Sequence, residues 1–143
     1  MSAERNKETI LRWIEEGWNR GEVDIADDLY SPDFTATPMA EGEAELRGIE
    51  AVKRYVEGTR SAFPDLRFTV QHLVAEGDLV VGVFHIEGTH QGAFFGMPAT
   101  GKRVSFSAID VWRFSDGKIA ERPVAVADFL RALQQMGVVP KLG

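Results

Sequence analysis

The feature that most constrains the fold is a change in the spacing of apolar residues at Pro64. Before it, apolar side chains recur at the i, i+3, i+4 spacing of amphipathic helices; in the first segment they are Ile10, Trp13, Ile14 and Trp18. After it, alternate positions carry the larger side chains, which is typical of a half-buried strand; these positions are Leu66, Phe68, Val70, His72 and Val74. The chain therefore places helices first and a sheet afterwards.

Turn and capping signals divide these two parts into elements. We predict helices to about residue 19 and over 23–29, 49–63 and 128–136, and strands over 66–74, 79–87, 104–114 and 118–127. Gly77-Asp78 and Asp116-Gly117 are the expected hairpin turns, and residues 35–48 are expected to form a loop. Helices followed by antiparallel strands indicate an α+β fold in which the helices cover one face of the sheet. The 143 residues suit a single domain, 1–143.

Composition narrows the class of partner. The chain has 16 basic and 22 acidic residues and a formal net charge of −6, so we expect no nucleic acid and no membrane surface as partner. The absence of cysteine excludes disulfides and thiolate chemistry. The polar N-terminus shows no secretory signal, and no apolar run approaches the roughly 20 residues of a membrane span. We expect a cytoplasmic protein with a small-molecule ligand.

Common catalytic motifs are missing from the sequence. There is no phosphate-binding Gly-Lys-Ser/Thr loop, no dinucleotide fingerprint and no Gly-x-Ser-x-Gly elbow. The chemistry left open is acid–base catalysis by carboxylates on a mostly apolar ligand, or ligand binding without reaction.

His72 and His85, which lie in the first two predicted strands, are candidate pocket residues. A two-residue turn at Gly77-Asp78 would place Val70 opposite His85 and His72 opposite Val83, all on the covered face of the sheet. Such histidines are either satisfied by neighbours near the rim of the sheet or line a pocket as proton carriers. No ligand set with a recognised spacing accompanies them, so no metal site is predicted.

Asp110 is an acidic residue among aromatic neighbours. The turn at Asp116-Gly117 would place Trp112 opposite Glu121 and Asp110 on the same inner face. Burial there would raise the pKa of Asp110 or Glu121 and so prepare an acid or base for work at neutral pH. The alternative is an internal ion pair, for which the available cations are Arg47, Arg60 and Arg122.

The orientation of the Asp128 side chain depends on the register of the last predicted strand, 118–127. In an unbroken ladder it would lie on the face opposite Asp110, but a bulge near Pro123 would reverse the alternation and turn it toward Asp110. The alternative role is the N-cap of the final helix. Trp18 lies on the core-facing stripe of the first helix, as part of the core or as an aromatic pocket wall.

Short motifs are spread over nearly the whole chain. They are Trp18-Asn19-x-Gly21, Ser31-Pro32-Asp33-Phe34, Arg47-Gly48-Ile49-Glu50, Phe63-Pro64-Asp65, Glu76-Gly77-Asp78, Gly88-Thr89-His90-Gln91-Gly92, Pro98-Ala99-Thr100-Gly101, Arg113-Phe114-Ser115-Asp116-Gly117-Lys118-Ile119 and Asp128 with Gln134-Gln135-Met136-Gly137. As an ordered set they resemble the SnoaL-like polyketide cyclases and ester cyclases of the NTF2-like superfamily.

The resemblance implies an NTF2-like, cone-shaped α+β barrel whose curved sheet and helices enclose a deep pocket, commonly in a homodimer or homotetramer. It implies that Asp128, just before the short C-terminal helix, is the general acid and base of an intramolecular aldol ring closure that needs no metal and no organic cofactor. By the same resemblance, Asp110, Glu121, Trp18 and Trp112 match positions that look like pocket lining.

The chain departs from the family pattern at one place. Family members typically read Glu-His-Trp after Gly-Lys-Ile, with an Asp six residues beyond the Glu, whereas here Glu121-Arg122-Pro123 is followed by Asp128 seven residues beyond Glu121. The extra residue fits a bulge at Pro123.

Our first hypothesis is a cofactor-independent cyclase or isomerase in which Asp128 moves a proton and Asp110 or a histidine hydrogen-bonds the enolate oxygen. The alternatives are a hydrolase, for instance of an epoxide, in which Asp110 with Glu121 or Asp128 activates water, and a non-catalytic ligand-binding protein.

Overall fold

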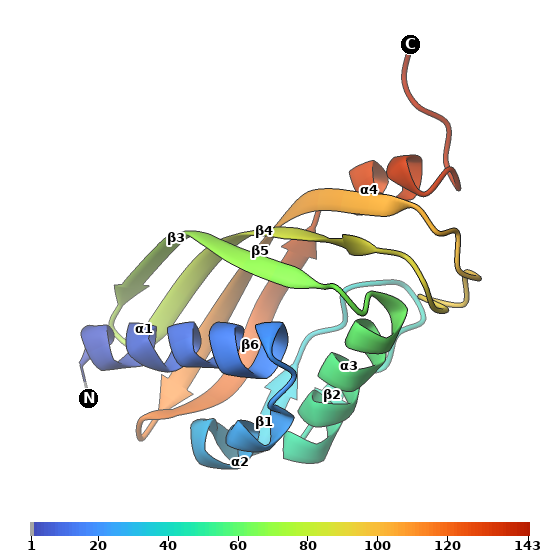
Figure 1. Ribbon diagram of the computed structural model, residues 1–143. Helices are drawn as coiled ribbons and strands as arrows, with labels where there is room; N and C mark the ends of the chain where they lie inside the picture. Colours follow the sequence, from blue (N-terminus) through green and yellow to red (C-terminus); the bar gives the residue numbers. More distant parts are fainter. Residues whose placement is uncertain (1) are drawn as a thin grey trace.

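The computed structural model describes residues 2–143 and shows an α+β fold. Figure 1 shows the arrangement of its helices and strands. Helix α1 (Ala3–Arg12) continues into a wider π-helical segment, η1 (Trp13–Asn19), as the first apolar stripe predicts. Ser2 caps α1 by accepting a hydrogen bond from the backbone N–H of Arg5 at 3.1 Å. Ile10, Trp13 and Ile14 are buried, so the predicted stripe does face the core.

The remaining elements follow the predicted order, with two additional strands in the part of the chain before residue 49. The helical elements are η2 (Val23–Ile25), α2 (Ala26–Leu29), α3 (Ile49–Ala62) and α4 (Phe129–Gln135). The strands are β1 (Tyr30–Ala36), β2 (Leu46–Arg47), β3 (Arg67–Glu76), β4 (Leu79–Thr89), β5 (Arg103–Ser115) and β6 (Lys118–Ala127).

Strand β1 is an element that the sequence did not reveal. It begins at Tyr30 and runs parallel to β6, where a helix end and a loop were expected. The ladder between β1 and β6 is interrupted between Tyr30 and Thr35, which accommodates Pro32, a residue that cannot donate a ladder hydrogen bond. Ser31-Pro32 thus marks an irregular strand, and within 35–48 the loop is limited to residues 37–45, between β1 and β2.

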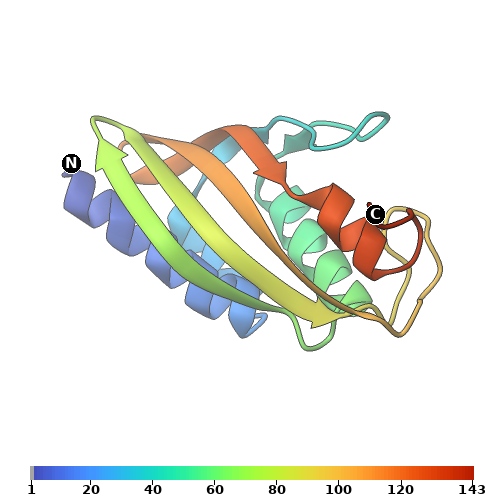
Figure 2. The same ribbon diagram turned by 90° about the horizontal axis from the view of Figure 1, so that it is seen from above.

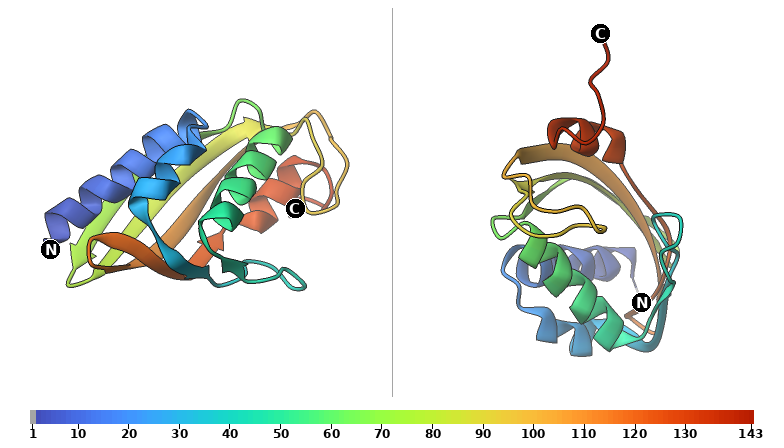
Figure 3. Two further views of the ribbon diagram at one scale, coloured as in Figure 1. Left: turned by 90° about the horizontal axis from the view of Figure 1, so that it is seen from below. Right: turned by 90° about the vertical axis from the view of Figure 1, so that its right-hand side faces the viewer.

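The sheet is strongly curved but does not close on itself. Its strand order is β2-β1-β6-β5-β4-β3, so β2 and β3 remain as edges. In Figures 2 and 3 the long strands bend around α1 and α3, which lie on the concave side, while α4 lies at one end of the sheet. The cone shape is therefore an open, curved sheet closed by helices. No helix within residues 2–143 combines the length and the apolar character needed to cross a membrane.

The inward orientation predicted for His72 and His85 is wrong, because β3 contains a bulge at Gln71. The predicted register holds from His72, which pairs with Val83, toward the turn, but it shifts by one residue beyond the bulge. His72 is exposed. His85 lies on the outer face, where its Nε2 is 2.9 Å from Ser105 Oγ. The larger apolar side chains of β4 decide its orientation, since Val80, Phe84 and Ile86 occupy the alternate, buried positions.

Candidate active site

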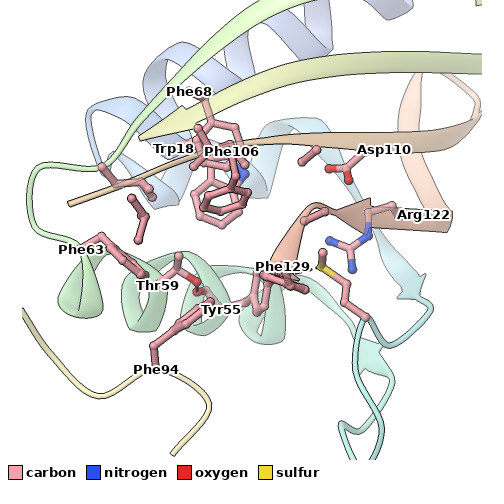
Figure 4. A pocket seen from close by; sticks show the side chains of 16 residues that line it. Trp18, Tyr55, Thr59, Phe63, Phe68, Phe94, Phe106, Asp110, Arg122 and Phe129 are labelled. Carbon is pink, nitrogen blue, oxygen red and sulfur yellow. Dashed lines mark hydrogen bonds between the residues drawn. The ribbon is translucent and has the colours of Figure 1, made fainter. Parts of the chain in front are cut away.

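A cavity lies between the concave face of the sheet, α3 and the start of α4 (Figure 4). Most of its wall is apolar, and six of its aromatic residues come from the helices and strands or directly follow α3: Trp18, Tyr55, Phe63, Phe68, Phe106 and Phe129. Phe94, from the loop between β4 and β5, adds a seventh ring. The cavity is thus suited to a flat, largely apolar molecule.

Trp18 is held in the cavity wall by the end of the first helix. The Asn19 side chain accepts from the backbone N–H of Phe68 at 2.7 Å and donates to its carbonyl at 3.0 Å, which attaches η1 to β3. Arg60 of α3 donates to the carbonyl oxygen of Trp18 at 2.8 Å. The Trp18 and Phe68 rings stack with centroids 4.7 Å apart. These contacts explain the Trp18-Asn19 motif, because Asn19 attaches η1 to β3 and Trp18 thereby lines the cavity.

Asp110 lies on the inner face of β5, as predicted. Its cross-strand partners are Gly82 and Ala125, two small residues that leave space beside the carboxyl group. The side chain lines the cavity, so the part of it that is accessible faces the ligand space. Burial raises the pKa of Asp110 from its ordinary value of 3.8 to about 6, and the positive charge of Arg122 counteracts part of this rise. Asp110 can therefore exchange a proton near neutral pH.

Trp112 is buried and lines a second, smaller cavity next to the first. Four residues border both cavities, and they are Trp18, Tyr55, Asp110 and Arg122. The two polar groups of opposite charge, Asp110 and Arg122, thus lie where the two spaces meet.

Glu121 lies outside the cavity, contrary to the predicted pairing with Trp112. One extra residue in β6 after Ile119 shifts the ladder, so that Glu121 pairs with Arg113 on the outer face. The carboxylate of Glu121 accepts a hydrogen bond from Arg113 Nε at 3.0 Å. The prediction that Glu121 lines the pocket is therefore wrong, since the hairpin turn alone did not determine the register.

Arg122 enters the cavity as a result of that same shift. The residue after the outward-facing Glu121 points inward, and Arg122 is only 9% exposed. A second shift follows at Arg122-Pro123, where the ladder with β5 is again irregular between Arg113 and Val111. The bulge expected at Pro123 is thus confirmed. Of the three cations considered as partners for Asp110, only Arg122 lines its cavity.

Asp128 does not turn toward the cavity. Two shifts in β6 cancel each other's effect on the alternation of side chains, so the backbone N–H of Asp128 bonds to Ser107 and its side chain lies outside. The carboxylate accepts hydrogen bonds from the backbone N–H and the Nε of Arg131, both at 3.1 Å. These contacts lower the pKa of Asp128. The N-cap role is confirmed, and the predicted turn toward Asp110 is wrong because β6 has two irregularities instead of one.

Tyr55 supplies a further polar group that the sequence did not single out as a ligand contact. Its hydroxyl donates to the sulfur of Met39 at 3.3 Å, and the Arg122 guanidinium lies 5.9 Å from the centre of its ring. Burial raises the pKa of Tyr55 to about 12, although Arg122 opposes the rise. Tyr55 is therefore a neutral hydrogen-bonding group at the polar end of the cavity. Within the described part of the chain, no three His, Asp or Glu side chains gather so that they could hold a metal ion.

Comparison with known proteins shows which family this chain resembles. The family model of the SnoaL-like polyketide cyclases matches residues 8–136. The aklanonic acid methyl ester cyclase of Streptomyces peucetius is 30% identical over 129 residues, which are 90% of this chain and 88% of that protein.

Two solved structures share the fold over almost the whole chain. A candidate SnoaL-like polyketide cyclase from Jannaschia sp. CCS1 has a TM-score of 0.85 at 26% identity, covering 96% of this chain and 95% of its own. AclR, a candidate hydroxylase from Streptomyces galilaeus, has a TM-score of 0.83 at 31% identity, covering 99% of this chain and 87% of its own. With a family model that extends from the first helix to the last, the chain belongs to the SnoaL-like polyketide cyclases.

Proposed function

We propose that this chain catalyses a cofactor-independent, intramolecular aldol-type ring closure or isomerisation of a small polyketide-like molecule, with Asp110 as the group that moves the proton. The relative from Streptomyces peucetius is a cyclase of aklanonic acid methyl ester, which supports the reaction class. The aromatic wall supports a flat substrate.

The position of Asp110 is the observation that carries this proposal. It is the one carboxylate among the described residues that line the two cavities. Its pKa of about 6 keeps the basic form abundant at neutral pH while leaving the acid form accessible. The family role that the resemblance assigned to Asp128 thus passes to Asp110, because Asp128 caps α4 at the surface.

The proposed reaction needs only one proton carrier. The Asp110 carboxylate removes a proton from the carbon next to a substrate carbonyl, and the electrons of the C–H bond form an enolate. The enolate carbon then attacks a second carbonyl carbon of the same molecule, which forms the ring and leaves an alkoxide. Protonated Asp110 returns its proton to the alkoxide, so no atom is gained or lost.

Two matched variants test the assignment, with aklanonic acid methyl ester as trial substrate. Asp110→Asn should lower the rate of ring closure by about 10²–10⁴-fold, the usual contribution of a positioned general base. Asp128→Asn should retain turnover within a few-fold, because its carboxylate contacts only Arg131. Ring closure by each variant can be followed by chromatography and mass spectrometry, and circular dichroism shows whether each variant is folded. Loss of turnover in Asp128→Asn with survival in Asp110→Asn would refute the assignment.

The hydrolase alternative required a second carboxylate beside Asp110. Glu121 and Asp128 were the groups considered, and both lie on the outside of the sheet. No observation therefore favours it over ring closure. A ligand-binding protein without catalysis would show binding with no turnover in the wild-type chain, so the same assay separates this alternative.

A further inference from the structure

Arg122 is a buried cation that forms no direct ion pair with another side chain among residues 2–143. No carboxylate oxygen within residues 2–143 lies close enough to form an ion pair with it, that is, within 4.0 Å. One terminal nitrogen donates to the carbonyl of Thr37 at 3.3 Å. The Nε–H is buried and has no acceptor among the described residues. A buried guanidinium without a directly paired carboxylate is costly, and because Arg122 lines the cavity a ligand group can supply the missing negative charge.

The surroundings of Arg122 define where that ligand group lies. In Figure 4, Arg122 and Asp110 occupy one end of the cavity, away from Phe63 and Phe94. The two charged groups line both cavities without touching each other, so a ligand atom can lie between them. The backbone also holds Arg122 in place, since its carbonyl accepts from the N–H of Thr37 at 3.2 Å.

We propose that the guanidinium group of Arg122 binds an oxyanion of the substrate, so that the cavity selects a flat aromatic or polyene molecule whose enolisable carbonyl reaches the Arg122–Asp110 end. This inference rests on the proposed function in one respect only, namely that the oxyanion is the oxygen of an enolate. A guanidinium donor to a charged oxygen forms a stronger hydrogen bond than one to a neutral oxygen. Arg122 therefore favours the ionised form of the reacting group over its neutral form.

This role complements the proton transfer by Asp110. When Asp110 takes the proton from carbon it becomes neutral, and the negative charge moves to the substrate oxygen. The Arg122 guanidinium then faces an oxyanion in place of the carboxylate, so the total charge at this end of the cavity is unchanged. A fixed positive group at the site of charge development stabilises the transition state without reorganisation.

A cyanonaphthol probe tests the inference without any turnover. On binding, the probe O–H bond breaks, its proton passes to Asp110 or to solvent, and the naphtholate oxygen accepts the hydrogen bond from Arg122. Naphthol and naphtholate absorb at different wavelengths, so the bound form is read directly. The methyl ether of the same probe is the neutral control, and quenching of Trp18 fluorescence measures the affinity of both.

We expect the wild-type chain to bind the probe as naphtholate at a pH where the free probe is still naphthol. Arg122→Gln should bind it as naphthol with about tenfold to hundredfold lower affinity, while the methyl ether binds within about twofold of wild type. Arg113→Gln, which removes an exposed arginine from the outer face, should behave like wild type. If Arg122→Gln fails to fold, Arg122→Lys should show weaker naphtholate binding, because an ammonium group lacks the planar set of N–H donors of the guanidinium.

Three results would overturn the inference. They are a wild-type chain that binds the probe as neutral naphthol, an equal loss of affinity for the probe and its ether, and an equal effect of Arg113→Gln. These results are independent of the catalytic test. If Asp110→Asn keeps its ring-closing activity, the proposed function fails but the probe result still stands. If the probe binds as naphthol while Asp110→Asn is inactive, only the role of Arg122 fails.

Discussion

Replacing Asp110 by Asn should make the protein more stable at neutral pH even as it removes the proposed proton carrier. The two side chains have nearly the same shape, so the change mainly removes an ionisable group from the cavity. Burial raises the pKa of Asp110 to about 6, which means that the folded protein holds the proton more tightly than the unfolded chain does. Ionised Asp110 therefore opposes folding, and the neutral amide does not.

The magnitude follows from the difference between the folded and the unfolded pKa. The folded value is raised, so the contribution of protonated Asp110 to stability is fully present below about 3.8 and is lost as the pH rises through about 6. Integrated over this window, the loss is about 3 kcal/mol. Arg122 is already included in this figure, because its attraction for the carboxylate is part of the pKa itself.

Urea unfolding of wild type and Asp110→Asn, measured near pH 4 and near pH 8, tests this expectation. The free energy of unfolding of the variant relative to that of wild type should rise by more than about 2 kcal/mol from pH 4 to pH 8. Asp128→Asn should behave in the opposite sense, since the N–H and Nε of Arg131 lower the pKa of Asp128 and stabilise its charged form above the unfolded pKa. A stability difference between wild type and Asp110→Asn that does not change with pH would refute the reasoning.

Gly82→Ala should destabilise the fold by about 1–3 kcal/mol in urea unfolding, because the added carbon would lie 2.4 Å from the Phe84 ring beside Asp110. Asn19→Ala should cost about 1–3 kcal/mol, since it leaves the backbone N–H and carbonyl of Phe68 without their side-chain partner, and a shifted Trp18 fluorescence spectrum should accompany the loss. Self-association remains a prediction from the family resemblance, and sedimentation should find a species of at least twice the 15.9 kDa monomer mass.

The sequence was informative where one local rule decides the outcome. The apolar stripe of Ile10, Trp13 and Ile14 predicted a helix whose buried face is the observed one. The alternation along β5 placed Asp110 on the inner face, and an acidic residue among aromatic neighbours was enough to single it out. In these cases the spacing of side chains within a single element determines which face is buried.

The register of neighbouring strands could not be predicted in the same way. One bulge at Gln71 was enough to place His72 and His85 on the outer face, contrary to the prediction. No residue type at that position indicates a bulge. Strand β1 was missed because Ser31-Pro32 reads as a stop signal, although an irregular strand beside β6 tolerates a proline. Both errors concern pairing between strands, which depends on how the whole sheet packs and not on the spacing of side chains within one strand.

The bulges of β6 determine which charged groups reach the cavity. In an unbroken ladder Glu121 would face inward, and a single shift near Pro123 would bring Asp128 inward as a second acid. The first shift sends Glu121 out and brings Arg122 in, and the second sends Asp128 out. The cavity therefore holds one carboxyl group and one cation of fixed charge instead of several carboxylates, which would repel one another and an enolate alike. A site that must stabilise developing negative charge gains more from this exchange than from an additional proton carrier.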